Sequence, residues 1–200
     1  FIHRLMAFVR DSVLQCIEQM EAMSVFTENN DEEIHFSESL KTSPPEVPVK
    51  ASDLWLRTES QQFQNVSRAM WREFCLEYQK PIMSRFRYVS YGCCEDLTDR
   101  IDDVLVIPNL RIFVKSPWTD WRKTIEKCGD RYSIVWRQLA TEVLSSDTLE
   151  AVAEKIAEGL RASRGCHRAI VLQELITASG HPERFHEWVK VARDASERFS

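Results

Sequence analysis

The stretch that decides the fold class of this chain is Tyr88-Val89-Ser90-Tyr91-Gly92-Cys93-Cys94-Glu95. Aromatic and β-branched residues at its start are typical of a strand, and a short helix is expected after it. In α/β proteins, the chemistry is usually placed where a strand ends and a helix follows. Two adjacent thiols and a carboxylate at that point are suited to bind a soft metal or to hold a nucleophile.

The same alternation of strand and helix continues along the chain. Further strands are expected at residues 24–27, 111–115, 132–137 and 169–175. Helices are expected at about residues 6–23, 68–86, 97–106 and 118–128, from Asp147 with its capping partner Glu150 to Gly165, and from Pro182 onward. Ser116 and Pro117 are expected to begin the helix at 118. Strands separated by helices predict βαβ units and therefore a parallel sheet.

Five strands are fewer than a closed barrel needs, since a (β/α)₈ TIM barrel has eight strands and about 250 residues. We therefore expect a single α/β domain over residues 1–200, the C-terminal part (about five βα units) of such a barrel, with its N-terminal strands missing. The outer strands would be exposed parallel edges, which predicts either a preceding N-terminal half or a homo-oligomer. Residues 30–54, acidic and then proline-rich, form a long lid-like loop in this interpretation.

Composition limits the function classes. The chain is 44% hydrophobic and 28% charged with a net charge of −5, and no basic stripe appears, so no nucleic-acid partner is expected. No apolar run approaches the roughly 18 residues that span a bilayer, so no membrane association is expected. Six cysteines without a pattern typical of a secreted disulfide framework predict a reduced, cytoplasmic protein.

Several ordered pieces of the sequence resemble the uroporphyrinogen-decarboxylase-like TIM barrels. They are His3-Arg4-Leu5-Met6, Leu54-Trp55 with Glu59-Ser60-Gln61, Tyr78-Gln79-Lys80-Pro81, Tyr91-Gly92-Cys93-Cys94-Glu95, Ile107-Pro108-Asn109-Leu110-Arg111, Ser116-Pro117-Trp118, Arg164-Gly165-Cys166-His167 and Pro182-Glu183-Arg184. The resemblance covers nearly the whole chain, and it implies the uroporphyrinogen decarboxylase type of (β/α)₈ barrel.

The resemblance implies two chemistries. Uroporphyrinogen decarboxylases are cofactor-free, and their key arginines and aspartates lie mainly in the N-terminal half. Cobalamin-linked methyltransferases of the superfamily bind zinc through a His-x-Cys at a strand end and a later cysteine. Tyr91-Gly92-Cys93 matches that place with tyrosine instead of histidine, and Gln173, Glu174 and Ile176 stand where the later cysteine would be.

The metal candidates are accordingly Cys93, Cys94 and Glu95, with Glu174 as a possible substitute. A catalytic zinc uses three protein ligands and keeps one open position. The structural alternative is that one thiol packs in the core while the other caps a turn.

Other polar residues are expected at the ends of strands, where they would face the mouth of the barrel. Glu28 and Glu174 are candidate acids or bases, Arg137 is a candidate anion ligand, and Glu59 is a further catalytic candidate. The candidate substrate contacts are Trp55, Arg57, Gln61, Tyr91 and Trp118. Each candidate also has a structural alternative. Glu28 could cap a helix or a turn, and Arg137 could pair with a neighbouring carboxylate. The residues around Trp55 could form a solvated loop that is packed by this one tryptophan.

The leading functional expectation is zinc- and thiolate-assisted methyl transfer to or from a small molecule, linked to a corrinoid carried by a partner protein. The first alternative is metal-free decarboxylation of a uroporphyrinogen-like polycarboxylate. The second alternative is a non-catalytic or degenerate half-barrel that binds a ligand or a partner chain.

Overall fold

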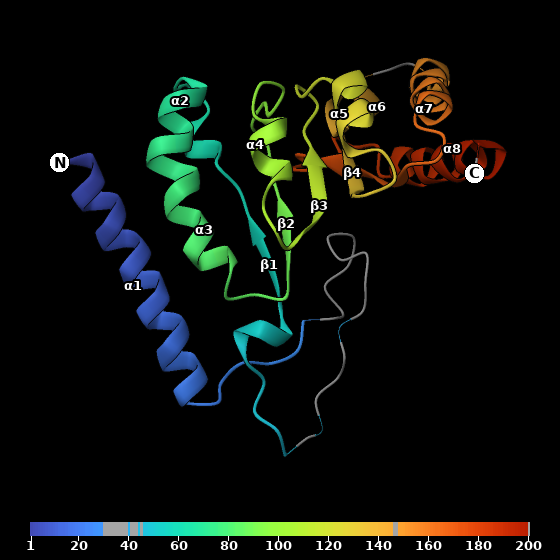
Figure 1. The fold of residues 1–200 in the computed structure, drawn as a ribbon. Helices are drawn as coiled ribbons and strands as arrows, with labels where there is room; N and C mark the ends of the chain where they lie inside the picture. The colour runs from blue at the N-terminus through green and yellow to red at the C-terminus, as the bar shows by residue number, and fades with distance from the viewer. Residues whose placement is uncertain (30–39, 41–43, 45, 146–147, 200) are drawn as a thin grey trace.

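The computed structural model describes residues 1–29, 40, 44, 46–145 and 148–199, and it is an α/β fold around one five-stranded sheet (Figure 1). The strands lie in the order β1-β2-β3-β4-β5, and every neighbouring pair is parallel. Their bounds are β1 Trp55–Thr58, β2 Tyr88–Tyr91, β3 Leu110–Lys115, β4 Ser133–Leu139 and β5 His167–Gln173. The predicted parallel sheet with alternating helices is confirmed.

Four of the five predicted strands are confirmed with small shifts at their ends, and the first is wrong. Residues 24–27 have no regular structure, and the first strand is β1, directly after the predicted loop. Ser24 has a positive φ of 52°, and Val25 is about half exposed, so this segment joins no sheet. Asn29 reaches the sheet only with its side chain, whose amide bonds the backbone nitrogen and oxygen of Trp55 at 3.1 and 3.0 Å.

The helices follow the predicted alternation with adjusted ends. Their bounds are α1 Ile2–Ala22, α2 Arg68–Trp71, α3 Glu77–Met83, α4 Ile101–Leu105, α5 Trp121–Cys128, α6 Ala140–Leu144, α7 Glu150–Ala162 and α8 Glu183–Phe199. A π-helical turn, Arg72–Leu76, joins α2 to α3, and α3 ends at Met83, three residues before the predicted end of the helix over 68–86. Short 3₁₀ turns lie at Ala51–Asp53 and Gln61–Phe63.

One predicted helix start is wrong and another lies outside the described residues. Helix α5 begins at Trp121, because Asp120 is its N-cap and accepts a 2.7 Å bond from the backbone nitrogen of Lys123. Ser116 instead pairs with Thr119 in the preceding turn. The predicted cap Asp147 is not among the described residues, and α7 begins at Glu150.

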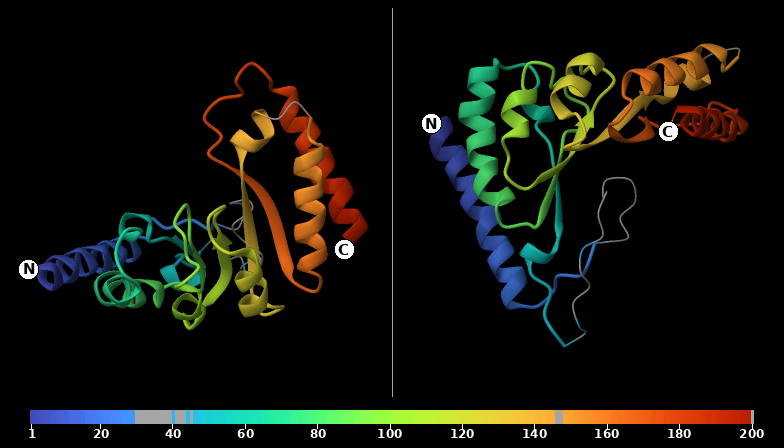
Figure 2. Two further views of the ribbon diagram at one scale, coloured as in Figure 1. Left: turned by 90° about the horizontal axis from the view of Figure 1, so that it is seen from above. Right: turned by 45° about the vertical axis from the view of Figure 1, so that its right-hand side comes forward.

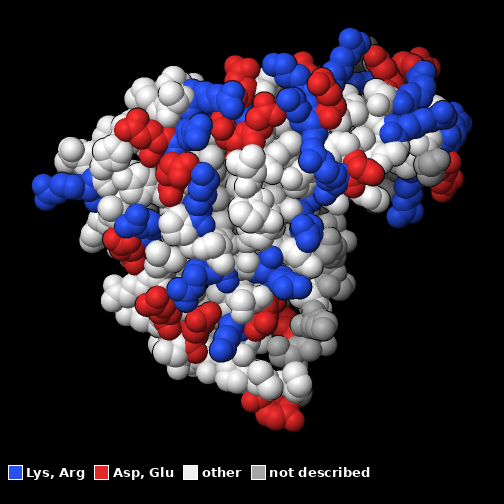
Figure 3. All heavy atoms as spheres, viewed as in Figure 1, with Lys and Arg blue, Asp and Glu red and all other residues white. Residues whose placement is uncertain are grey.

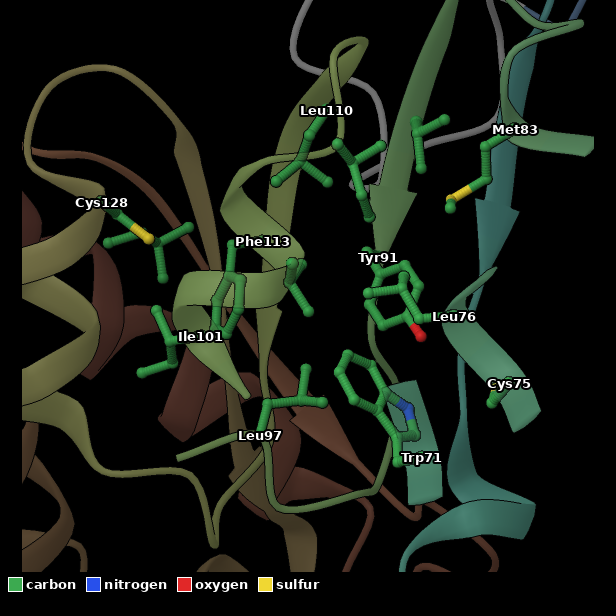
Figure 4. Close-up of a cluster of buried hydrophobic side chains, with 14 residues drawn as sticks. Trp71, Cys75, Leu76, Met83, Tyr91, Leu97, Ile101, Leu110, Phe113 and Cys128 are labelled. Carbon is green, nitrogen blue, oxygen red and sulfur yellow. The ribbon is translucent and has the colours of Figure 1, made fainter. Parts of the chain in front are cut away.

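Both faces of the sheet are buried, as is usual for parallel sheets. Figure 4 shows the helix-side cluster, in which Tyr91 lies beside Trp71 and Leu76, and Phe113 lies beside Ile101. The opposite face carries a second cluster of five buried residues: Trp55, Ile112, Val114, Val135 and Val171. Helices α7 and α8 pack together beside β4 and β5 and enclose a third cluster around Ile156 and Trp188 (Figure 2).

The surface gives no dominant sign of charge on the face drawn in Figure 3, where basic and acidic side chains are interspersed. None of the helices in the described part of the chain has the length and apolar character needed to cross a bilayer.

Candidate functional site at the carboxyl edge of the sheet

The turn that carries the two thiols depends on Gly92. This residue follows β2 with a φ of 114°, a conformation that side-chain-bearing residues rarely adopt. A Cβ atom there would lie 2.6 Å from the carbonyl oxygen of Val114, so only glycine lets the turn approach β3 this closely. Cys93 and Cys94 follow at the carboxyl edge and are both half-buried.

Glu95 holds this turn to the end of the neighbouring strand. Its side chain is fully buried, and one carboxylate oxygen accepts bonds from the backbone nitrogen of Ser60 at 2.7 Å and from its hydroxyl at 3.1 Å. The other oxygen accepts a 2.9 Å bond from the backbone nitrogen of Cys93. Three donors therefore occupy the carboxylate. Glu95 positions the turn and is not available as a metal ligand.

Two arginines from opposite sides of the turn meet at the sulfur of Cys93. Arg137 on β4 donates from Nη1 to Cys93 Sγ at 3.3 Å, and Arg57 on β1 donates from Nη2 to the same atom at 4.0 Å. Both belong to the sheet face that carries Trp55 and Val135, because side chains two residues apart on a strand share a face. Since the two donor nitrogens contact the same sulfur atom, they lie no more than about 7.3 Å apart.

The environments of these arginines differ. The Arg137 side chain is nearly buried, with its residue only 9% exposed, whereas Arg57 is exposed. Among the described residues, neither forms an ion pair with a carboxylate, and the hydrogen-bond partners of Arg137 are the sulfurs of Cys93 and Cys94. A buried guanidinium without an anionic partner is unfavourable unless a ligand supplies the charge.

Two buried polar atoms on the same sheet face also have no hydrogen-bond partner within the described ranges. They are Ser90 Oγ on β2 and Gln173 Oε1 at the end of β5. Ser90 is paired in register with Arg57, which places its side chain on the face of the two arginines. Unpaired buried polar atoms of this kind are commonly satisfied by water or a ligand.

The two thiols lie close together, with 3.6 Å between Cys93 Sγ and Cys94 Sγ. Burial, and next the hydrogen bond with Cys93, raises the pKa of the Cys94 thiol to about 11. Two thiolates on one tetrahedral zinc would lie about 3.8 Å apart, given Zn–S distances of about 2.3 Å. The spacing fits two ligands, but the described residues include no group of three candidate ligands, and Glu95 is already occupied.

Two of the predicted site residues lie at the amino end of the sheet instead. Trp55 begins β1 with its ring 4.9 Å from that of Tyr88, and both belong to the apolar face of the sheet. Glu28 precedes Asn29, whose amide bonds Trp55, so Glu28 does not end a strand as predicted. The physical reason is that residues 24–27 form no strand, which removes the element that would have carried Glu28 to the carboxyl edge.

The remaining predicted residues surround the site with different roles. Glu59 accepts bonds from the Gln61 backbone and the Gln62 side chain, which makes it part of a local turn. Tyr91 points into the helix-side core, where its hydroxyl donates to Gln79 at 2.9 Å, and burial raises its pKa. Trp118 is half exposed, and Glu174 follows β5 with a φ of 60°.

Sequence reasoning missed one residue at this edge, Lys115, which ends β3 and is 5% exposed. Among the described residues, its ammonium donates one long bond of 3.4 Å, to the carbonyl oxygen of Pro117. Burial, and secondly the charge of Lys155, lowers the pKa of Lys115 to about 8. A lysine ending the apolar run Ile112-Phe113-Val114 is the sequence signal that could have identified it.

No family model matches this chain, and no curated protein matches it either. The resemblance to the uroporphyrinogen decarboxylase superfamily therefore stays a prediction from sequence pieces.

Proposed function

We propose that this chain is part of a (β/α)₈ barrel of the uroporphyrinogen decarboxylase type, and that its carboxyl edge binds a small polycarboxylate without a metal. One observation carries the proposal: two guanidinium groups, from Arg57 and Arg137, converge on Cys93 and have no carboxylate partner among the described residues. A substrate bearing two carboxylates would supply both missing charges.

The burial of Arg137 supports a charged ligand rather than a neutral one. Guanidinium groups bind carboxylates through paired N–H donors, and such charge-assisted bonds are roughly twice as strong as neutral ones. Because Arg137 is nearly buried, its attraction to a carboxylate is less screened than it would be at the surface. Ser90 and Gln173 offer a hydroxyl and an amide on the same face for further polar groups of the substrate.

The barrel type is supported by the all-parallel strand order and by burial of both faces of the sheet. In closed barrels of this kind, substrates bind at the carboxyl ends of the strands. Arg57, Cys93 and Arg137 lie at or near those ends, on β1, on the turn after β2 and on β4.

The chemistry that this site favours is loss of carbon dioxide. When a carboxylate leaves as CO₂, the electron pair of the broken C–C bond stays on the substrate carbon until a proton is added. Cationic donors that are already in place stabilise that negative charge without having to reorganise. Arg137 is the residue proposed for this stabilisation, and Arg57 is proposed to hold a second carboxylate.

A second candidate is methyl transfer with a zinc-bound thiolate and a corrinoid partner protein. The 3.6 Å separation of the two sulfurs favours it, because it is close to the spacing of two zinc ligands. The nearby Arg137 cation disfavours it, since a second positive charge beside the same sulfur is repelled.

Calorimetric titration with citrate and with propane-1,2,3-tricarboxylate tests the proposal. We expect binding by the wild type that weakens at least about tenfold in Arg137→Ala and in Arg57→Ala, a loss of about 1.4 kcal/mol each. Arg122→Ala, on the exposed side of α5, is the control and should bind like the wild type. Equal binding by all variants would refute the assignment of the two arginines.

Metal analysis under reducing conditions separates the two candidates. About one zinc per chain, lost in Cys93→Ser and Cys94→Ser, would support the methyltransferase alternative. A folded protein with neither metal nor carboxylate binding would support the non-catalytic half-barrel.

A further inference from the structure

The two adjacent thiols carry an inference that is independent of carboxylate binding. Of the six free cysteines, Cys75 and Cys128 are buried in the core, and Cys16 is exposed on α1. Cys93 and Cys94 are both half-buried at the edge of the sheet, and their sulfurs lie 3.6 Å apart. A disulfide requires about 2.05 Å, so the two sulfurs need to approach by about 1.5 Å, and the bond is strained and readily reduced because adjacent Cα atoms lie closer than the usual 4.4 Å.

The surroundings of the pair favour attack on a peroxide. Arg137 Nη1 lies 3.3 Å from Cys93 Sγ and 3.9 Å from Cys94 Sγ, and Arg57 Nη2 lies 4.0 Å from Cys93 Sγ. When a sulfur attacks one peroxide oxygen, the other oxygen departs with negative charge. Guanidinium donors beside the sulfur are placed to stabilise that charge.

The backbone around the two cysteines also allows their sulfurs to approach each other. Residues 92–95 belong to no helix or strand, so the Cys93–Cys94 peptide is not part of a regular backbone ladder. Glu95 holds both the backbone nitrogen of Cys93 and the end of β1 at Ser60, so the movement required is confined to the two cysteine side chains and the Cys93–Cys94 peptide. The two thiols can therefore move relative to each other while the strands stay in place.

We propose that Cys93 and Cys94 are a peroxide-sensitive pair that is oxidised reversibly to a disulfide between adjacent residues. In the first step, the Cys93 sulfur attacks hydrogen peroxide, the O–O bond breaks, and Cys93 becomes a sulfenic acid as one water leaves. In the second step, the Cys94 sulfur attacks the Cys93 sulfur, the S–O bond breaks, and a second water leaves with the Cys94 proton. Two thiols and one peroxide thus give one disulfide and two waters, and a thiol reductant reverses the reaction.

The test treats the full chain with hydrogen peroxide and follows each cysteine by alkylation and peptide mass spectrometry. The wild type should lose both Cys93 and Cys94 as alkylatable thiols in a single peptide and regain them after reduction. Cys94→Ser should stop at the sulfenic acid, which dimedone traps at residue 93. Cys93→Ser should leave Cys94 unoxidised under the same conditions, and Cys166→Ser should behave like the wild type.

Arg137→Met tests the contribution of the guanidinium, and we expect oxidation of Cys93 to slow about tenfold. Circular dichroism of each variant shows whether it is folded. Alkylation of Cys93 and Cys94 that persists after peroxide, or oxidation of Cys16 ahead of them, would overturn the proposal. So would a dimedone adduct on Cys93 in the wild type with no disulfide formed.

Discussion

Arg137 Nη1 lies 3.3 Å from Cys93 Sγ, which joins the end of β4 to the turn after β2 across the intervening β3. The contact is possible because Arg137 points to the sheet face that carries Val135, and because Gly92 allows the turn to pack closely against β3. It places a nearly buried cation beside two thiols, and both the proposed anion binding and the proposed oxidation depend on that arrangement.

The Glu95 carboxylate should be a major source of stability at the site. In Glu95→Gln, the amide offers one acceptor oxygen, and its NH₂ group faces donors of Ser60 or Cys93. We expect a loss of roughly 2–3 kcal/mol in the free energy of unfolding, measured by urea denaturation. Glu126→Gln, exposed on α5, should change stability little. Equal stability of the two variants would contradict the bracing role of Glu95.

Gly92→Ala should destabilise the protein more than Gly165→Ala does. Both glycines have a positive φ, of 114° and 81°, so both variants carry backbone strain of about 1 kcal/mol or more. Only the new Cβ at position 92 meets a backbone atom, the Val114 oxygen at 2.6 Å, whereas nothing lies within 4 Å at position 165. Thermal unfolding of the two variants measures the difference, and a larger loss at position 165 would argue against this packing.

Gly159→Ala should be destabilising although alanine is the better helix former. At a solvent-exposed position inside a helix, replacing glycine by alanine would raise the free energy of unfolding by about 1 kcal/mol. Here the new Cβ would lie 2.1 Å from the ring of Trp136, which is stacked on Trp121. Replacing the ring in the double variant Gly159→Ala/Trp136→Leu should remove this penalty, and a double-mutant cycle of unfolding free energies measures the coupling.

Lys115→Met should stabilise the protein at pH 7, and the gain should shrink in alkaline solution. The folded state lowers the pKa of this amine from 10.5 to about 8, so it holds the proton less tightly than the unfolded state does. Wild-type stability therefore rises as the pH increases from about 8 to 10.5, and the variant lacks this rise. At neutral pH the penalty that the variant removes is roughly 3 kcal/mol as an upper value.

Urea denaturation of both proteins between pH 7 and pH 10.5 tests the Lys115 prediction. The difference between their unfolding free energies should be largest at pH 7 and should decline through that window. A constant difference would mean that the ammonium finds a partner in the folded state. Lys123→Met, at an exposed position on α5, serves as the control for a lost surface charge.

Local sequence patterns were sufficient for most of the fold. The runs that became β2 to β5 were recognisable because aromatic and β-branched residues are bounded by turn residues, and the helices between them made the sheet parallel. The pattern failed at residues 24–27, which have strand-like composition. A strand forms only with hydrogen-bonded neighbours, and here β1, four residues long, takes the place beside β2.

Chain order by itself determined that Cys93, Arg137 and Glu174 would lie at one edge, because parallel strands all end on the same side of the sheet. The tertiary structure decided what the sequence could not. In the folded chain, Tyr91 packs in the helix-side core, and Arg57 lies on the other face with its guanidinium near Cys93. The buried Glu95 carboxylate holds the turn to Ser60. These outcomes depend on contacts between residues far apart in the chain, which local composition and spacing do not specify.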